Sequence, residues 1–309
     1  MQVEPARGFT LQSLSGKRYD LEKKLGEGAF GQVWECRCKT EKVAVKLIPP
    51  ATAEETLPEV EVQKRAAKLA ERCVPVFHEA GYGALVDPRT QKREDYFLIA
   101  MERVYGKSAK AILDTVTFPE GLVVFVLFDM LSVLMRLHDG DIAHCDIKPD
   151  NMLVSSQGVS YLCDYGVSKD FKNGATETSA VAGTPLYMAP EVVDLRRRRG
   201  GVVSTYGAPA DVWALGISVL HMVYGTTPLR EAEGDGNVEH LMSQIRSKKI
   251  VLQNVRPMTC DMEELVMKCL VRDPRRRHTS AQLMAEYGHL FPQQTSERAM
   301  FRDWLRKVL

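Results

Sequence analysis

The stretch His144-Cys145-Asp146-Ile147-Lys148-Pro149-Asp150-Asn151 decides how the rest of the chain is interpreted. It brings an acid, a lysine and an amide close together in the sequence. A helix-like apolar run precedes it, and a short strand-like apolar run follows it. Such a loop has a functional meaning only if the partners that it requires occur elsewhere in the chain and in the right order.

Length and composition limit the possible domain organisation and the classes of function. A chain of 309 residues can form one large domain or two lobes with a cleft. The net charge of +1 argues against a whole-protein role in nucleic-acid binding. Residues 1–7 contain no apolar signal-peptide core. The seven scattered cysteines favour reduced thiols, and we expect a cytoplasmic or nuclear protein.

The most apolar run of the chain, residues 121–137, is a candidate membrane span. A span needs about 20 predominantly apolar residues. This run is shorter, contains Asp129 and Arg136, and is ended by Asp139-Gly140. We therefore expect a buried central helix that leads into the opening stretch, and no membrane partner.

Glycines at Gly26, Gly28 and Gly31 give the spacing G-x-G-x-x-G within residues 25–33. Dinucleotide-binding folds use the same spacing, but there the glycines must open a helix. Here a strand-like alternation, a turn and a second strand pattern ending in Lys46 follow the glycines. This order favours a loop that covers phosphates, in which backbone amides approach closely because side chains are missing. A surface hairpin with a chance lysine is the alternative.

The rest of the N-terminal third has one helix-like segment, residues 54–71. Strand-like runs occupy residues 74–77 and 96–101, with a charged loop at 87–95 between them. We expect five strands and one helix in this part of the chain.

Four further motifs follow the opening stretch in order. They are Asp164-Tyr165-Gly166, Gly-Thr-Pro-Leu-Tyr-Met-Ala-Pro-Glu at 183–191, Asp-Val-Trp-Ala-Leu-Gly at 211–216, and Leu-Val-Arg-Asp-Pro-Arg-Arg-Arg at 270–277. Together with the glycine loop and Lys46, they resemble the motifs of eukaryotic protein kinases in their proper order. Lys148 after Asp146, and Thr184, resemble the serine/threonine type.

The resemblance covers the chain from about Tyr19 to Leu290 and implies the α+β, bilobal protein-kinase fold. It places a small antiparallel-sheet N-lobe with one helix at about 18–102, a hinge at 102–106 and a larger, mainly helical C-lobe at about 107–290. A C-terminal helical extension at 291–309 completes a single kinase domain over 1–309.

The resemblance also implies the chemistry of the site. Asp146 would orient the substrate hydroxyl and take its proton, and Lys148 would neutralise charge on the transferring phosphate. Asn151 and Asp164 would bind Mg²⁺. The residues implied in ATP binding are Gly26, Glu27, Gly28, Ala29, Phe30, Gly31, Val33, Ala44, Lys46, Met101, Glu102, Val104, Asn151, Leu153, Cys163 and Asp164.

Lys46 would lie beside the nucleotide, and a buried ammonium group needs a partner. A kinase supplies a glutamate from the next helix, and both Glu59 and Glu61 compete for that role. Glu59 shares its face with Val62 and Ala66, whereas the residues three and seven positions after Glu61 are lysines. We choose Glu59, although Gln63 stands where a kinase usually places an apolar residue.

The resemblance also implies residues with a structural role that take no part in the reaction. By resemblance, Asp211 accepts backbone amides of the catalytic loop. Arg277 and Glu191 are the candidates for a buried ion pair in the larger lobe.

Departures from the family pattern lead to two hypotheses. Cys145 replaces the arginine that commonly precedes the catalytic Asp and binds an activation-segment phosphate. Ala180 stands where many kinases are phosphorylated. Activity is therefore expected not to depend on phosphorylation there, with Thr176, Thr178 and Ser179 as remaining possible sites. Cys163 would line the nucleotide pocket, either as a small buried apolar residue or as a reactive thiol.

Three functional classes follow from the motifs. An active kinase for protein substrates needs Lys46, a helix Glu, Asp146, Asn151 and Asp164, and all are present. A pseudokinase that acts as a nucleotide-binding scaffold is the alternative, and a small-molecule phosphotransferase is disfavoured by the intact segment at 184–191. The arginines at 196–199 suggest acidic or phosphorylated substrates or a solvated loop. The sequence leaves the physiological substrate and the oligomeric state open.

Overall fold

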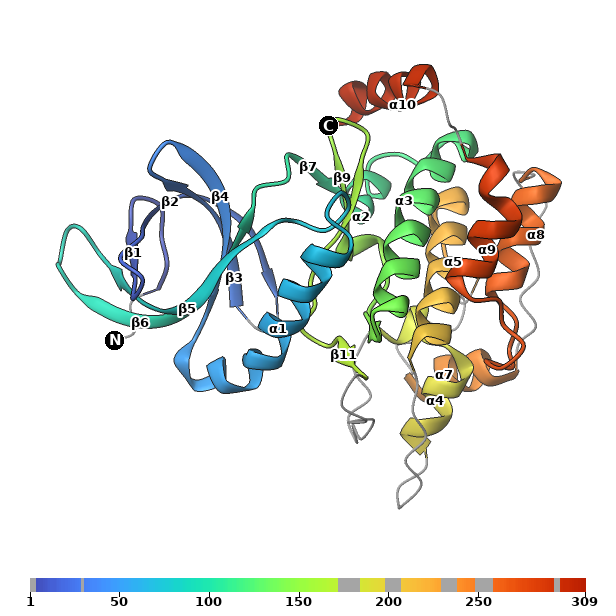
Figure 1. Ribbon diagram of the computed structural model, residues 1–309, viewed down its shortest axis with the longest axis horizontal. Coiled ribbons are helices and arrows are strands. Elements are labelled where there is room, and N and C mark those ends of the chain that lie inside the picture. The colour runs from blue at the N-terminus through green and yellow to red at the C-terminus, as the bar shows by residue number, and fades with distance from the viewer. Residues whose placement is uncertain are drawn as a thin grey trace. The chain divides into compact units, whose positions relative to one another are not determined.

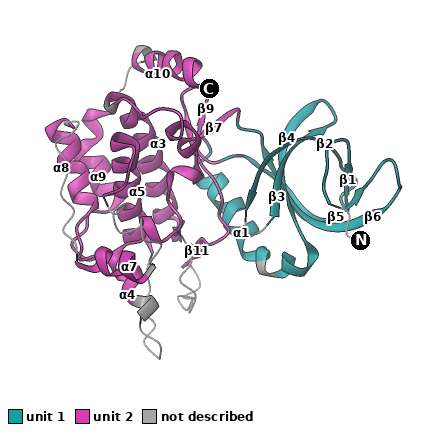
Figure 2. Ribbon diagram, turned by 180° about the vertical axis from the view of Figure 1, so that it is seen from behind, with its two compact units in different colours: residues 1–71, 75–104 teal, residues 72–74, 105–309 magenta. Residues whose placement is uncertain are grey.

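A computed structural model describes residues 4–28, 31–171, 184–197, 207–228, 238–247, 258–291 and 295–309 (Figure 1). Several predicted positions lie outside these residues: Ala29, Phe30, Thr176, Thr178, Ser179, Ala180, Gly183, Arg198 and Arg199. The chain divides into unit 1, residues 1–71 and 75–104, and unit 2, residues 72–74 and 105–309 (Figure 2). The expected antiparallel-sheet N-terminal part and mainly helical C-terminal part are confirmed.

Unit 1 is a closed antiparallel barrel in the strand order β1-β2-β3-β4-β6-β5. One long helix, α1, and a short 3₁₀ helix, η1, follow β4. The bounds are β1 Thr10–Ser13, β2 Arg18–Gly28, β3 Gly31–Cys38, β4 Glu41–Ile48, η1 Pro50–Thr52, α1 Ala53–Leu69, β5 Phe77–Val86 and β6 Arg93–Glu102.

The strand β1 is a correction to the sequence prediction, which had five strands and began the lobe at about residue 18. Leu11 on β1 pairs with Tyr19 on β2 and with Leu85 on β5, so this short strand closes the barrel. Leu11 and Leu85 are fully buried in the barrel core. Four residues are too few to show a clear alternation, which explains why the pattern missed the strand.

The glycine loop joins two paired strands and does not open a helix. Gly28 on β2 faces Gly31 on β3, and Gly26 faces Val33. Gly31 has a φ of 139°, and a Cβ atom there would lie 2.1 Å from the carbonyl oxygen of Leu47 on β4. This position therefore requires glycine, and the strand–loop–strand prediction is confirmed.

Unit 2 is mainly helical, with short strands near its start. Its helices are α2 Ala109–Leu113, α3 Glu120–Asp139, α4 Pro190–Arg197, α5 Ala208–Tyr224, α7 Val238–Ser247, α8 Cys260–Cys269, α9 Ser280–Tyr287 and α10 Thr295–Val308. Its strands are β7 Gly106–Ser108, β8 Ile142–Ala143, β9 Met152–Ser155, β10 Ser160–Leu162 and β11 Lys169–Asp170, and its 3₁₀ helices are η2 Pro149–Asn151, η3 Pro185–Tyr187 and η4 Gly288–Leu290.

The helix α3 is long and apolar enough, by length and composition, to cross a membrane. The argument from its length was therefore wrong, because the helix has 20 residues. In unit 2, however, α3 is a core helix: Val126, Leu127 and Leu134 are fully buried. The prediction of a buried central helix is confirmed.

The helix α5 packs beside α3 and supports the opening stretch (Figure 1). Pro209 stands in its first turn, and Gly225 ends it in the left-handed conformation, with a φ of 71°. Between these signals nearly every residue is buried, including Asp211 and Trp213. A buried carboxylate at the start of the helix requires hydrogen-bond partners, and the opening stretch provides them.

Candidate active site

Unit 1 contributes the pair of Lys46 on β4 and Glu59 on α1. The Lys46 Nζ lies 2.6 Å from the Glu59 Oε1, and the two side chains are 11% and 5% exposed. Glu61 is exposed instead, because two residues along a helix turn the side chain to the other face. The structure thus brings together the pair chosen from the sequence, and the catalytic role of that pair stays a prediction.

The strand register places other predicted nucleotide-binding residues near Lys46. Val33 on β3 pairs with Lys46, and Ala44, two residues before Lys46 on the same face of β4, pairs with Met101 on β6. One turn of α1 beyond Glu59, the buried Gln63 donates its Nε2–H to the Met101 sulfur at 3.4 Å. The unusual polar residue of α1 therefore has a partner within unit 1.

The predicted hinge residues carry backbone bonds of their own. The Glu102 N–H donates to the Val76 carbonyl at 2.8 Å, so an adenine contact of Glu102 would use its carbonyl. The Arg103 guanidinium donates to the Val104 carbonyl, so a contact of Val104 would use its N–H.

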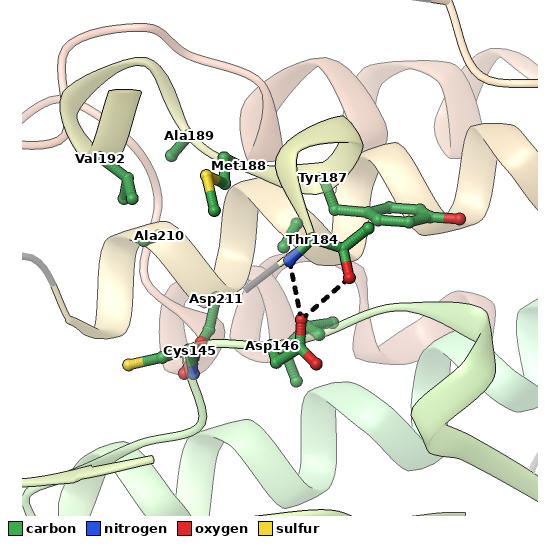
Figure 3. Close-up of a pocket in the computed structure, with 11 residues that line it drawn as sticks. Cys145, Asp146, Thr184, Tyr187, Met188, Ala189, Val192, Ala210 and Asp211 are labelled. Atoms are coloured by element: carbon green, nitrogen blue, oxygen red, sulfur yellow. Dashed lines mark hydrogen bonds between the residues drawn. The ribbon is translucent and has the colours of Figure 1, made fainter. Parts of the chain in front are cut away.

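Unit 2 contributes Asp146, Lys148 and Thr184, which lie within hydrogen-bond distance of one another. The Lys148 Nζ lies 2.7 Å from the Asp146 Oδ2 and donates to the Thr184 Oγ1 at 2.7 Å. Thr184 in turn donates its backbone N–H to the Asp146 Oδ1 at 3.1 Å and its hydroxyl at 3.4 Å (Figure 3). The Thr184 contacts were missed at the sequence level, where Thr184 served only as a class signal.

The conformation of the opening stretch is fixed by Asp211. Its two carboxylate oxygens accept the backbone N–H groups of His144 and Cys145 at 2.8 Å each, and His138 Nε2 lies 3.0 Å away. Cys145 has a φ of 65°, a left-handed conformation that is uncommon for a non-glycine residue. The bonds to Asp211 hold this conformation, as the resemblance implied for that residue.

The Cys145 side chain points away from the Asp146 carboxylate (Figure 3). Burial raises the pKa of its thiol well above the usual value, and the nearby Lys169 opposes that shift less strongly. The Cys145 thiol therefore stays neutral at neutral pH and does not act as a nucleophile there. It also cannot bind a phosphate as an arginine would.

Asn151 and Asp164, the predicted magnesium residues, flank the hairpin of β9 and β10. The Asn151 Nδ2 donates to the backbone oxygen of Asp146 at 2.9 Å and to its Oδ2 at 3.0 Å. The Cys163 N–H donates to the Asn151 carbonyl at 3.0 Å, which ties the two ends of the hairpin together just before Asp164. Asp164 has a φ of 66°.

The donor set fits magnesium. Among the described residues, no group of three or more His, Cys, Asp or Glu side chains gathers at one point. Mg²⁺ needs no such cage, because it binds one or two protein oxygens and completes its shell with water and substrate phosphates. The bonds of the Asn151 Nδ2 to Asp146 turn its amide oxygen, the atom that binds cations, away from Asp146.

The remaining three side-chain predictions differ in outcome. The Arg277–Glu191 pair is present, with bonds of 2.7 and 3.0 Å. The Cys163 sulfur donates to the Asn151 carbonyl at 3.2 Å, and its reactivity stays a prediction. Arg196 and Arg197 belong to α4, but their side chains lie outside the described part of the chain.

Comparison with known proteins adds independent evidence. A family model described as "Protein kinase domain" matches residues 19–287. The chain is 34% identical to mouse mitogen-activated protein kinase kinase kinase 15 over 62% of this chain and 14% of that protein. It is 29% identical to serine/threonine-protein kinase dst1 of Dictyostelium discoideum over 92% of this chain and 36% of that protein.

A third relative is serine/threonine-protein kinase hippo of Drosophila melanogaster. It is 28% identical over 94% of this chain and 40% of that protein. The chain thus spans less than half the length of these curated relatives.

Proposed function

Because the chain belongs to the serine/threonine protein kinase family, we propose that it transfers the γ-phosphate of ATP to serine or threonine hydroxyls of protein substrates. The observation that carries this proposal is the cluster of Asp146, Lys148 and Thr184. It places a carboxylate that can take the hydroxyl proton in contact with an ammonium group that can neutralise phosphate charge, as phosphoryl transfer to a hydroxyl requires, and Thr184 contacts both groups.

Each residue has a distinct task in this reaction. Asp146 accepts a hydrogen bond from the substrate hydroxyl and takes its proton as the oxygen attacks the γ-phosphorus, whose bond to the β-phosphate oxygen breaks so that ADP leaves. Lys148 neutralises charge on the transferring group, and its bond to Thr184 fixes where the ammonium group lies. Asn151 and Asp164 hold magnesium, and Mg-ATP supplies the phosphoryl group and the divalent charge.

In unit 1, Lys46 binds phosphate oxygens while Glu59 keeps its ammonium group in place. The glycine loop brings backbone N–H groups to the phosphates, and Val33 and Ala44 supply apolar contacts to the base. These roles follow from the family and from the register of β3, β4 and β6.

The experiment uses labelled ATP, magnesium and a peptide library, with Asp146→Asn as the matched control. Transfer to Ser/Thr peptides that disappears in the variant, while nucleotide binding stays, supports the proposal. Nucleotide binding without transfer in the wild-type chain would contradict it and support the pseudokinase alternative. Transfer to a small alcohol but to no peptide would indicate a small-molecule phosphotransferase.

We also propose that this activity does not require phosphorylation of the activation segment. The neutral, buried thiol of Cys145 offers no positive charge to a phosphate, and Ala180 has no hydroxyl. If alanine at Thr176, Thr178 and Ser179 together abolishes turnover while the protein stays folded, the idea fails.

The substrate preference is a separate proposal. The four arginines at residues 196–199 carry positive charge close in sequence to the segment that positions peptides, which favours acidic or phosphorylated substrates. Replacing these arginines with glutamine should raise the Michaelis constant for acidic peptides and leave that for neutral peptides unchanged. An equal change for both peptide classes would count against the proposal.

A further inference from the structure

The helix α10, Thr295–Val308, lies beyond the region that the family model matches, which ends at residue 287. It packs on unit 2 beside α3 and the β7–β9–β10 sheet (Figures 1 and 2). The function proposed above makes no use of it. It contacts α3 and the turn of the hairpin formed by β9 and β10.

The strongest of these contacts is an ion pair between Arg298 on α10 and Asp129 on α3. The Arg298 Nη2 lies 2.7 Å from the Asp129 Oδ1, and Nη1 lies 3.3 Å from Oδ2. Asp129 is only 3% exposed, and burial raises its pKa, which Arg298 opposes. A charge at this depth needs its partner, so the position of Arg298 is strongly specified.

The same two side chains hold the hairpin. Asp129 Oδ2 accepts the backbone N–H of Ser160, the first residue of β10, at 2.8 Å. Arg298 Nη1 donates to the carbonyl of Gly158, in the turn between β9 and β10, at 2.6 Å. A Cβ atom at Gly158 would lie 3.1 Å from the Arg302 Cγ, so the turn touches the helix directly.

Aromatic contacts hold the rest of α10 against unit 2. The Phe301 ring stacks on Phe125 of α3 with centroids 5.1 Å apart, and the Trp304 ring lies 5.2 Å from that of Phe118. The Arg298 guanidinium lies over the Phe125 ring at 5.5 Å. These contacts remove both faces of the interface from water and fix the direction in which Arg298 reaches.

The hairpin connects the turn that α10 contacts with the predicted magnesium residues. Ser160 pairs with Val154, and Leu162 pairs with Met152. At the other end of the ladder Asn151 precedes β9, and Asp164 follows β10. One end of a short, rigid ladder is therefore held by α10, and the other end carries both predicted magnesium residues.

We propose that α10 is a clamp that positions Asn151 and Asp164 for magnesium, with Arg298 and Asp129 as its positioning residues. The proposal rests on the proposed function, which gives those two residues their metal role. Loss of Arg298 leaves the Asp129 carboxylate buried without its cation and frees the turn at Gly158. The hairpin then moves relative to α3, and the magnesium residues lose their fixed separation.

The test measures magnesium affinity without catalysis. Binding of a non-hydrolysable ATP analogue is titrated against Mg²⁺, and the Mg²⁺ midpoint is compared between variants. In Arg298→Gln the midpoint should rise about 10-fold, the range found when residues behind metal ligands are replaced. The matched control is Arg306→Gln on the same helix, whose side chain is 73% exposed and pairs with Asp303, and it should leave the midpoint unchanged.

A merely structural role gives a different result, namely a lower melting temperature with an unchanged midpoint, which overturns the proposal. If Arg298→Gln fails to fold, Arg298→Lys replaces it, because lysine keeps the charge but loses the two-pronged contact. A smaller rise in the midpoint is then expected, and a folded Arg298→Lys protein with a wild-type midpoint overturns the clamp. Because the measurement needs no phosphoryl transfer, an inactive wild-type chain would refute the proposed function and leave this test valid.

Discussion

Two buried ion pairs, one in each unit, differ in their cation. One has the ammonium group of a lysine, and the other has the guanidinium group of an arginine that also binds backbone carbonyls. The Lys46–Glu59 contact joins one ammonium group to one carboxylate at 2.6 Å. Arg277 makes two bonds to Glu191 and directs its remaining donors to three backbone carbonyls of unit 2, those of Pro209, Val271 and Arg272. Its guanidinium also lies over the Trp213 ring.

This difference indicates that the Arg277–Glu191 pair is the structural one. The Arg277 side chain is fully buried, and its donors are committed to the protein, so it joins α4, α5 and the segment after α8. Lys46 instead carries a compact charge on a flexible stem, and it stands in register with the glycine-loop strands. Burial of an ion pair alone therefore does not distinguish catalysis from stability, whereas the type of cation and the backbone carbonyls that Arg277 binds do.

The largest expected effect is on stability, in Arg277→Met. Removal of the guanidinium leaves a carboxylate and several buried carbonyls without their donor, and we expect a loss of about 3–5 kcal/mol in the free energy of unfolding. Denaturant titration measures it. The control is Arg275→Met, whose side chain is 87% exposed and which should change stability by less than about 1 kcal/mol. Equal losses of stability in the two variants would show that the Arg277–Glu191 pair has no special structural role.

The second effect is on catalysis, in the double variant Lys46→Met/Glu59→Leu. Replacing both partners of a buried pair with apolar side chains removes the two opposite charges together, so the fold should remain about as stable as the wild type. Phosphoryl transfer should fall by about 10²–10³ because a donor to the phosphates is lost. The measurements are kcat on a peptide substrate and the melting temperature.

The matched double variant in unit 2 is Arg277→Met/Glu191→Leu. Here stability should still fall, since the carbonyls of Pro209 and Val271 lose their donor even when the carboxylate is removed. A stable Arg277→Met/Glu191→Leu protein, or an active Lys46→Met/Glu59→Leu protein, would show that the two pairs do not differ in the proposed way.

The sequence predicted the parts of the site that local patterns determine. The order of motifs gave the fold, and helical periodicity chose Glu59 over Glu61 because side chains two residues apart face different sides of a helix. Strand alternation placed Lys46 at the end of an apolar run. The last two are short-range signals, visible within a single helix or strand.

Contacts between distant segments were not predictable in the same way. The ion pair of Arg298 and Asp129 joins residues 169 positions apart, and no local pattern selects one arginine of the last helix over its neighbours. Likewise, β1 is recognised only once the edges of β2 and β5 are known, because closing the barrel gives Leu11 its core position. Thr184 became a site residue only when the fold brought it to Asp146.

The smallest expected effect concerns a partly exposed network of charged side chains in unit 1, which differs from the two ion pairs above in its contact with water. Glu35 lies 2.7 Å from the Lys42 Nζ and 2.8 Å from the Arg103 Nε, and the Lys42 side chain is 37% exposed. The hydrogen bond from Lys42, aided by Arg103, lowers the pKa of Glu35 below its usual value of 4.5. Water screens such a network, so Glu35→Gln should cost only about 0.2–1 kcal/mol at neutral pH.

The pH dependence follows from the direction of that shift. A carboxyl group whose pKa is lower in the folded state stabilises the fold above its unfolded pKa, and this contribution is lost as the pH falls through the folded pKa. The stability difference between wild type and Glu35→Gln should therefore be constant above about pH 5 and shrink toward zero in more acidic solution. Denaturant titrations at several pH values measure it, with Glu27→Gln, at an exposed pair with Lys24, as the control that should show no measurable difference. A Glu35→Gln protein that is more stable than the wild type at neutral pH, with a difference that disappears on acidification, would mean that burial destabilises the Glu35 carboxylate and that its two cations do not compensate.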